Sequence, residues 1–318
     1  MILADTRWSG VHGIGRYASE VLPRLSVDWS ALEVGGKPSD PQDFLRVRRT
    51  PGGETIYSPG YNGFLARSPQ VVTVHDLIHL HPTTNRRAVY LAHYSAVLRP
   101  IIRRNRLVLT VSETSKRAIE EWVDDDRVRV VNAGNGLSEA FHPGGSPATD
   151  DSAPYFLYVG NLRAHKNVDV VFRALARVPE AKLVVVMNDR EGAERRATEL
   201  GVVDRVEVRT GLTDPELADL YRGAVATVFP SLVEGFGLPA VESIACGTPV
   251  IFWEGCESIA EIVRGQGMPI GDAHDELAWA SALFEMLADS PRAALPVNTY
   301  SWDRTARIVT SVLREATE

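Results

Sequence analysis

The chain has 318 residues, enough for about two domains, and its 44% of hydrophobic residues can fill the cores of both. The net charge of −7 disfavours a general nucleic-acid-binding protein, which would carry an excess of Lys and Arg. No apolar run is long enough to span a membrane, and the first residues lack the pattern of a signal peptide. The two cysteines, Cys246 and Cys256, predict reduced thiols in a cytoplasmic protein rather than a disulfide framework or a zinc site.

The first half of the chain alternates between strand and helix patterns. Apolar runs predict strands at residues 1–4, 70–74, 107–111 and 127–131. Helical periodicity predicts helices over residues 86–104 and 113–122. A stretch rich in Pro, Gly and Ser at residues 141–154 then predicts a linker between two domains.

The second half alternates more regularly. Predicted strands lie at residues 155–160, 182–187, 205–209 and 224–229. Predicted helices lie at residues 167–178, 190–201, 214–222 and 239–246. Asn167 and Asp214 are the expected N-caps of two of these helices, and Gly201 closes another. Such alternation is typical of a parallel sheet that is covered by helices on both faces.

These patterns predict an α/β protein with two Rossmann-like, doubly wound domains that face each other across a cleft. We expect the domains to comprise residues 1–145 and 153–300. An amphipathic helix at residues 301–316, which Ser301 can cap, is expected to pack the end of the chain, 301–318, back on the first domain. Ligands of such sheets bind at the carboxyl ends of the strands, so the cleft is the expected site.

Two glutamates, Glu234 and Glu242, flank a loop that joins a predicted strand to a predicted helix. Gly235, Gly237 and Pro239 predict a tight turn into a helix N-terminus, whose N–H groups and dipole attract anions. Carboxylates are good acceptors for hydroxyl groups on neighbouring carbons. The combination suits a diphosphate flanked by two polyols, as in a nucleotide sugar, although helix-capping acids in an ordinary loop give the same pattern.

The segment P-S-L-V-E-G-F-G-L-P-A-V-E-S-I-A-C-G-T-P-V-I, residues 230–251, resembles the signature of retaining glycosyltransferase family 4, whose enzymes have the GT-B fold. Other segments that resemble the family are G-V-H-G-I-G-R-Y (10–17), V-V-T-V-H-D-L-I (71–78), V-S-E-T-S-K-R-A-I (111–119), N-G-L-S-E-A-F-H-P (135–143) and Y-V-G-N-L-R-A-H-K-N (158–167). The first two of these are most similar to mannosyltransferases of surface-polysaccharide assembly. The resemblance implies that the first domain takes the acceptor and the second the donor.

The resemblance implies a role for each matching residue. The catalytic residues would be His75, Lys166 and Glu234. The donor-binding residues would be Gly13, Arg163, Lys166, Gly211, Leu212, Glu234, Gly235, Phe236, Gly237, Leu238 and Glu242. The acceptor-binding residues would be Arg16, Tyr17 and Asp76, with packing of the first helix as the alternative role of Arg16 and Tyr17. Asn161 and His165 stand where the family often has a second basic residue, which leaves Arg163 as a candidate for contact with the diphosphate.

Within these roles, Glu242 would hold the ribose hydroxyls, Glu234 those of the transferred sugar, and Lys166 the diphosphate. Positive charge that is fixed near the diphosphate stabilises the negative charge that develops as the sugar leaves. Lys166 and the helix N-terminus can supply that charge, and the cleft segments contain no Asp-x-Asp triplet. We therefore expect no metal and no cofactor.

The resemblance implies a retaining, metal-independent hexosyltransferase that uses a nucleotide diphosphate sugar. GDP-mannose is the favoured donor, and the acceptor would be a glycan, a lipid-linked sugar or a small molecule in polysaccharide biosynthesis. Two alternatives stay open. One is a non-catalytic glycosyltransferase-like partner of another enzyme, and the other is a nucleotide-sugar epimerase on the same fold.

The segment 86–106 is strongly basic, and no Asp or Glu lies between Asp76 and Glu113. Its arginines are Arg86, Arg87, Arg99, Arg103, Arg104 and Arg106. A solvated helix face explains this pattern, and so does peripheral contact with anionic lipid at the inner face of the membrane, where a lipid-linked acceptor would lie.

Overall fold

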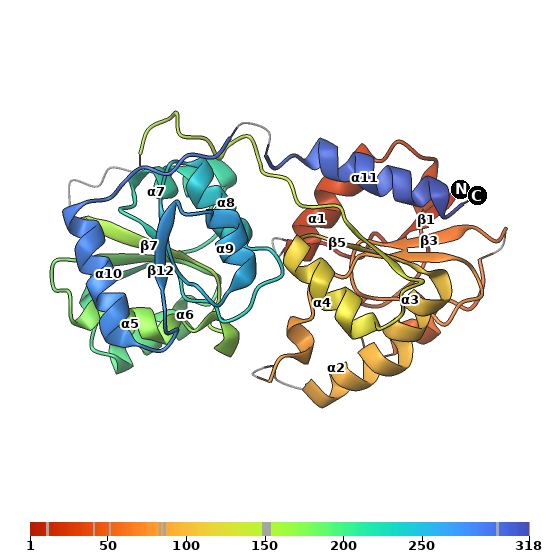
Figure 1. Ribbon diagram of the computed structural model, residues 1–318, viewed down its shortest axis with the longest axis horizontal. Helices are drawn as coiled ribbons and strands as arrows, with labels where there is room; N and C mark the ends of the chain where they lie inside the picture. The colour runs from red at the N-terminus through yellow and green to blue at the C-terminus, as the bar shows by residue number, and fades with distance from the viewer. Residues whose placement is uncertain are drawn as a thin grey trace. The chain divides into compact units, whose positions relative to one another are not determined.

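The computed structural model describes residues 1–10, 13–40, 42–50, 52–82, 84, 87–147, 154–296 and 299–317 (Figure 1). The chain divides into two compact units. Unit 1 comprises Met1–Gly136 and Tyr300–Glu318, and unit 2 comprises Leu137–Thr299. In the described ranges, no helix is long and apolar enough to cross a membrane.

Unit 1 is built on two groups of parallel strands. The strands are β1 (Ile2–Ala4), β2 (Trp29–Ala31), β3 (Thr55–Ser58), β4 (Gln70–Val72), β5 (Leu107–Thr110) and β6 (Arg129–Asn132). Their order is β2-β1-β3-β4 in one group and β5-β6 in the other, and a parallel bridge from Thr73 to Leu109 joins the groups. The strand order reverses direction between β1 and β3, which is the switch point where ligands of such sheets bind.

Among the described residues, unit 1 has five α-helices. They are α1 (Gly13–Val21), α2 (Arg87–His93), α3 (Arg99–Asn105), α4 (Glu113–Val123) and α11 (Trp302–Glu315). A π-helical segment, Tyr94–Leu98, joins α2 to α3, so the helix expected at 86–104 is built in three parts. Helix α11 lies beside α1, where the Trp302 and Tyr17 rings meet edge to face with centroids 6.2 Å apart (Figure 1). Ser301 caps α11, since its hydroxyl accepts from the Arg304 N–H at 3.4 Å.

Unit 2 contains one parallel sheet of six strands. The strands are β7 (Tyr155–Val159), β8 (Lys182–Val186), β9 (Val206–Arg209), β10 (Thr227–Phe229), β11 (Val250–Trp253) and β12 (Gly267–Ile270). The helices are α5 (Val168–Ala176), α6 (Arg190–Glu199), α7 (Asp214–Gly223), α8 (Leu238–Ala245), α9 (Glu257–Val263) and α10 (Glu276–Ala288). The order β9-β8-β7-β10-β11-β12 is that of a Rossmann fold, with its switch point between β7 and β10. The predicted α/β, Rossmann-like class is confirmed.

One expected helix cap lies at the predicted position without forming the cap bond, and another is wrong. Asn167 occupies the N-cap position of α5 with a left-handed backbone, φ of 49°, but its side-chain amide donates to the carbonyl of Ala273 at 2.8 Å. Thr213 rather than Asp214 caps α7, because Thr213 and Glu216 satisfy each other's backbone N–H groups in a capping box. For Asn167 a partner elsewhere in the fold takes the side chain, and for α7 the cap lies one residue earlier than predicted.

The boundary between the units falls earlier than the predicted linker. Residues 137–147 pack on unit 2: the Phe141 ring meets Tyr221 edge to face, with centroids 6.0 Å apart. The Arg222 side chain also donates to the carbonyls of His142, at 3.1 Å, and Ser146, at 3.2 Å. Composition predicts irregular structure here, but it cannot show that one unit holds the segment. Residues 148–153 of the predicted linker lie outside the described ranges.

Candidate functional site

Lys166 and Glu234 meet at the carboxyl edge of the sheet of unit 2. Lys166 lies in the loop after β7, and Glu234 lies in the loop after β10. Because β7 and β10 are neighbouring strands, both loops lie at the switch point. Lys166 Nζ donates to Glu234 Oε1 at 2.5 Å, and the side chains are only 16% and 10% exposed. Two predicted catalytic residues that are 68 positions apart are thus in direct contact.

The two loops are fixed to each other through their backbones. The Leu232 N–H donates to the carbonyl of the buried His165 at 2.7 Å. The Ser258 hydroxyl donates to the carbonyl of Glu234 at 3.0 Å. Lys166 Nζ also lies 5.9 Å from the centroid of the Phe229 ring, at the end of β10. Since the backbones are held in this way, the side chains of Lys166 and Glu234 can change partners without a rearrangement of the loops.

Gly237 shapes the turn from this loop into helix α8. Its φ of +106° is a conformation that residues with a side chain rarely adopt. A Cβ at this position would also lie 2.2 Å from Cδ1 of Ile259. The N-cap residue of α8 is Gly237, which has no side chain to cap the helix, and the first turn contains no acidic residue. The positive end of the α8 dipole therefore lies within four residues of Glu234 without a capping carboxylate.

Glu242 lies deeper, in the second turn of α8. Its side chain is 4% exposed, and Oε2 accepts a hydrogen bond of 3.0 Å from the buried hydroxyl of Tyr221 in α7. Burial raises the pKa of the neighbouring Cys246 to about 12, with Arg222 opposing the shift and Glu242 adding to it. The two glutamates thus differ in setting, since Glu234 pairs with a cation and Glu242 with a neutral hydroxyl.

The other donor-binding candidates follow strands of the same sheet. Gly235, Phe236 and Leu238 belong to the β10–α8 segment with Glu234. Gly211, with φ of +68°, and Leu212 follow β9 at the same edge. Arg163 is exposed, and its backbone N–H donates to the side chain of Asn161 at 3.0 Å. The topology of unit 2 thus brings all of its predicted site residues to one edge.

The unit 1 candidates gather at the carboxyl edge of the other sheet. His75 follows β4, and its Nε2 forms a hydrogen bond of 2.9 Å with the carbonyl of Pro59, which follows β3. Asp76 accepts from the Ile78 N–H at 2.9 Å. Arg16 is half-buried on α1. Unit 1 therefore also presents its candidates beside its switch point.

Tyr17 does not lie where an acceptor could touch it. Its side chain is fully buried, and its ring packs edge-on against the His75 ring with centroids 4.8 Å apart. Burial raises the pKa of Tyr17 well above its usual value. Tyr17 therefore has the alternative predicted role, which is packing of the first helix. Gly13 has open space around its Cα, whereas a Cβ on Gly15 would lie 2.4 Å from the Gly10 carbonyl oxygen, so the second glycine is the one that the turn requires.

A buried ion network near the switch point of unit 1 was not predicted from the sequence. Arg7 donates to Asp5 on one side, at 2.9 and 2.6 Å, and to Asp43 on the other, at 2.6 and 2.9 Å. The buried amide of Asn62 donates to both carboxylates, and the Trp8 indole N–H donates to Asn62 at 2.6 Å. Burial opposes the charge on Arg7, but the hydrogen bonds to Asp5 and Asp43 raise its pKa well above the usual value. Its members come from three separate loops, so no local sequence signal marks them.

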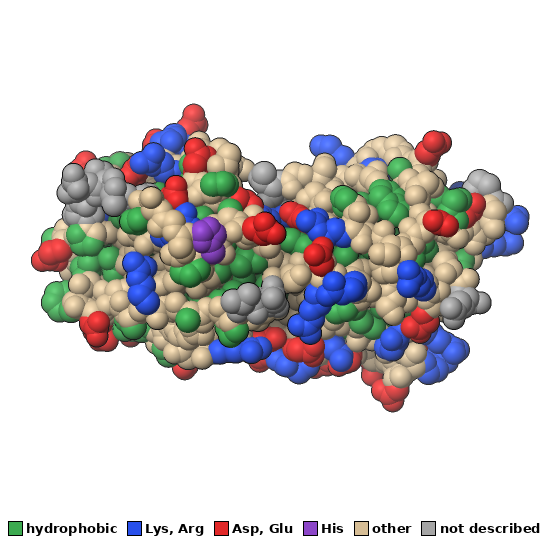
Figure 2. All heavy atoms as spheres, turned by 90° about the horizontal axis from the view of Figure 1, so that it is seen from above, with side chains coloured by type: hydrophobic (Ala, Val, Ile, Leu, Met, Phe, Trp, Pro, Cys, Tyr) green, Lys and Arg blue, Asp and Glu red, His purple; other side chains and the backbone are tan. Residues whose placement is uncertain are grey.

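The arginines of segment 86–106 are largely used inside unit 1. Arg99 and Arg103 both donate to the carbonyl of Val123 at the end of α4, at 3.1 and 2.9 Å. Arg104 donates to the carbonyl of Ala66 at 2.6 Å. Arg86 lies outside the described residues. Figure 2 shows basic and acidic side chains interspersed on the face that it draws. These arginines therefore link the helical segment to other parts of unit 1, and the segment is not a purely solvated helix face.

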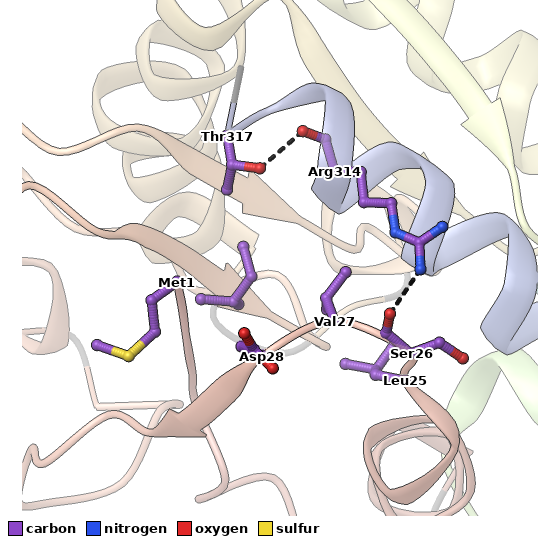
Figure 3. A pocket seen from close by; sticks show the side chains of 8 residues that line it. Met1, Leu25, Ser26, Val27, Asp28, Arg314 and Thr317 are labelled. Carbon is purple, nitrogen blue, oxygen red and sulfur yellow. Dashed lines mark hydrogen bonds between the residues drawn. The ribbon is translucent and has the colours of Figure 1, made fainter.

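A hollow of about 550 Å³ lies at the opposite, amino edge of the sheet of unit 1 (Figure 3). Its lining includes Met1, Asp28 and Arg314, and Arg314 donates to the carbonyl of Ser26 at 2.7 Å. It lies away from the carboxyl edge, where the candidate residues gather. In the part of the chain that the structure describes, no three His, Cys, Asp or Glu side chains are grouped as metal ligands.

Known proteins that resemble this chain are glycosyltransferases. Residues 145–296 match the family model described as Glycosyl transferases group 1. The chain is 33% identical over 238 residues to a D-inositol 3-phosphate glycosyltransferase of Xylanimonas cellulosilytica, covering 67% of this chain and 57% of that protein. A protein of the same name from Thermobispora bispora is 35% identical over 246 residues, covering 67% and 56%. The chain thus spans a little more than half the length of these curated relatives.

Solved structures show the same fold. WaaG, described as a glycosyltransferase involved in lipopolysaccharide biosynthesis, matches with a TM-score of 0.65 at 14% identity, over 99% of this chain and 98% of that one. The sucrose-phosphate synthase of Thermosynechococcus elongatus matches with a TM-score of 0.60 at 22% identity, over 82% and 68%. The expected kinship with glycosyltransferases is confirmed, whereas family 4 and the mannosyltransferase likeness stay predictions. The chain thus carries a glycosyl transferases group 1 domain at residues 145–296 and has the fold of the GT-B glycosyltransferases.

Proposed function

We propose that this protein is a retaining, metal-independent glycosyltransferase that moves a hexose from a nucleotide diphosphate sugar to an acceptor. The observation that carries the proposal is the contact of Lys166 with Glu234 at the switch point of unit 2, four residues before helix α8. A cation and a helix N-terminus suit a diphosphate, and a carboxylate beside them suits sugar hydroxyls. The match of this segment to a glycosyltransferase family model supports the same reading.

In the proposed reaction an acceptor hydroxyl attacks the anomeric carbon of the donor sugar on the face that the diphosphate leaves. The bond between that carbon and the phosphate oxygen breaks, and the phosphate oxygen takes the proton of the acceptor. Lys166 and the N-terminus of α8 stabilise the charge that develops on the diphosphate. Glu234 holds the sugar hydroxyls, Glu242 holds the ribose, and His75 is the third catalytic residue of the proposal.

Mannose from GDP-mannose is the favoured transferred group, and UDP-glucose and a UDP-N-acetylhexosamine are the next candidates. The acceptor is a glycan, a lipid-linked sugar or a small molecule. Relatives named for D-inositol 3-phosphate make an inositol phosphate a specific small molecule to include among the acceptors tested.

We further propose a cytoplasmic location, with peripheral contact between segment 86–106 and an anionic membrane. Arg99, Arg103 and Arg104 donate to backbone carbonyls of other elements of unit 1. Arg87 donates to the carbonyl of Leu80, seven residues before it, at 2.7 Å. Arg87 and Arg106 are both exposed, and we propose that the contact depends on these two side chains. Binding to anionic vesicles should then fall when both are changed to Gln, and should weaken with added salt. Equal binding by the double variant and the wild type would remove the membrane from the proposal.

The function is tested by incubating the protein with GDP-mannose, UDP-glucose and UDP-N-acetylglucosamine, each with an acceptor panel and each with and without EDTA. We expect one donor to yield nucleoside diphosphate and a glycosylated product whose anomeric configuration, measured by NMR, matches that of the donor. Activity should survive EDTA. An inverted product or a loss of activity that Mg²⁺ restores would contradict the mechanism. An epimerised donor would support the epimerase, and no reaction with any donor would support the non-catalytic partner.

A further inference from the structure

The proposed roles of Lys166 and Glu234 place the two side chains in competition. Lys166 has to meet a diphosphate, and Glu234 has to meet sugar hydroxyls, yet each is the other's partner at 2.5 Å. Their low exposure, 16% and 10%, limits screening by water and salt, so the attraction between them is stronger than in an exposed pair. A diphosphate that approaches Lys166 therefore competes with the carboxylate of Glu234.

On the basis of the proposed function, we infer that Glu234 makes the site prefer the intact sugar donor over the nucleoside diphosphate product. When the donor binds, the sugar hydroxyls engage the carboxylate of Glu234, and Lys166 turns to the diphosphate. After transfer, the sugar leaves with the acceptor, and Glu234 loses its hydroxyl partners. Its carboxylate then pairs with Lys166 again, which weakens the hold on the diphosphate and favours release of the product.

The neighbours of the pair favour such an exchange. The loop backbones are fixed by the bonds from Leu232 to His165 and from Ser258 to Glu234, so only side chains have to move. Burial raises the pKa of Cys256 to about 12, and Glu234 adds to that shift. Burial likewise raises the pKa of Tyr158, whose hydroxyl donates to the carbonyl of Asn161 at 2.8 Å. Both groups are neutral at physiological pH, so neither replaces Lys166 as a cation or Glu234 as an anion.

The test is calorimetric titration of the wild type and of Glu234→Gln with GDP, UDP and ADP, and then with the corresponding nucleotide sugars. Glutamine keeps the shape of glutamate but carries no charge, so Lys166 becomes fully available to the diphosphate. We expect the variant to bind its cognate nucleoside diphosphate about tenfold more tightly, or more. Its affinity for the sugar donor should not rise, so the preference for donor over product should fall. Equal or weaker binding of the nucleoside diphosphate would overturn the inference.

Two further variants separate the exchange from other effects. Lys166→Gln combined with Glu234→Gln should abolish the gain, because the gain acts through Lys166. Glu276→Gln breaks the pair of Arg177 with Glu276, also 2.5 Å in length and also in unit 2, and should leave nucleotide affinity unchanged. A gain that persists in the double variant, or that appears in Glu276→Gln, would contradict the exchange.

The folded state and the proposed function are checked in the same series. Thermal unfolding monitors each variant, and Glu234→Asp, which keeps the charge but shortens its reach, should show a smaller gain than Glu234→Gln. Product inhibition supplies a second readout, because the inhibition constant of the nucleoside diphosphate should fall about as far as its dissociation constant. If the wild type binds none of the three nucleotides, the proposed function fails. If the wild type binds one of the nucleotides, and neither Glu234→Gln nor Glu234→Asp binds that nucleotide more tightly, only the inferred exchange fails.

Discussion

The two units place a charged cluster at the same point of similar sheets, but the clusters are built differently. In unit 1, Arg7 lies between Asp5 and Asp43, and Asn62 donates to both carboxylates. In unit 2, Lys166 pairs with the single carboxylate of Glu234. The first cluster joins three segments through many mutual hydrogen bonds, whereas the second is a short ion pair just before a helix, with the Phe229 ring 5.9 Å from Lys166 Nζ.

Under the proposed function, this difference separates charges that stabilise the fold from charges that bind a ligand. Each carboxylate of the unit 1 cluster is fixed by Arg7 and Asn62, so a ligand would have to break several bonds to enter. In unit 2, a ligand that brings a diphosphate and hydroxyls can replace one contact with two. A position at a switch point is therefore not enough to identify a ligand-binding charge. The number of bonds that the charge already makes also determines whether a ligand can displace its partners.

The largest effect on stability is expected from a substitution that breaks the Arg7 cluster of unit 1. Arg7→Met removes the cation that pairs with the buried carboxylate of Asp5 and leaves Asp43 with Arg46, 3.4 Å away, so it should lower the free energy of unfolding by about 3–5 kcal/mol. Urea denaturation measures the change. Arg196→Met, which removes a more exposed partner of Asp169, should cost about 1 kcal/mol or less. If the two variants are equally stable, the Arg7 cluster does not stabilise unit 1 more than an exposed ion pair does.

The next effect falls on the chemistry of unit 2. Lys166→Ala removes the cation that faces the diphosphate and should lower kcat by about 10²–10³-fold, since one donor to developing charge is worth that much. Nucleotide binding should weaken as well, because the diphosphate is also bound in the ground state. Steady-state kinetics and titration with nucleoside diphosphate measure the two effects. A variant that retains a third of the wild-type kcat would show that Lys166 is not part of the reaction.

A smaller effect distinguishes the second glutamate from the first. Glu242→Gln weakens the proposed contact with the ribose, which is far from the reacting bond, so it should raise KM for the donor about tenfold and leave kcat nearly unchanged. Tyr221→Phe removes the hydrogen bond to Glu242 but keeps the carboxylate, and should raise KM less. A fall of kcat with unchanged KM in Glu242→Gln would place this residue at the sugar instead of the ribose.

The smallest effect concerns the basic segment of unit 1. Arg103→Gln removes donors to the terminal carbonyls of α4 and should lower the free energy of unfolding by about 1 kcal/mol. Binding to anionic vesicles should not change, because this side chain is engaged within the fold. Urea denaturation and vesicle sedimentation measure the two quantities. Unchanged stability together with lost vesicle binding would reverse the assignment of Arg103.

Individual strands and helices show which features the local sequence pattern predicts and which it misses. The strands at 182–186 and 206–209 and the helix at 190–199 agree with their predicted positions to within two residues, because apolar periodicity is a local property. Strand β3, at 55–58, was not predicted, although it lies at the centre of the first group of strands in unit 1. Its four residues contain a Thr and a Ser, so the apolar pattern is weak, and its burial comes from strands on both sides.

The sequence by itself determined the α/β class, the glycine turn before α8 and the pair Glu234 and Glu242 that flanks it, while its resemblance to a glycosyltransferase family implied Lys166 as a candidate. The class, the turn and the glutamate pair depend on residue type and on spacing along a short stretch of chain. Only the tertiary structure decided that Lys166 and Glu234 touch, that Tyr17 is buried, and that Arg7 joins Asp5 to Asp43. Each of these depends on strand order, because neighbouring strands bring together loops that are far apart in the chain. Charge and burial act through space, and the order of the strands sets which charges become neighbours.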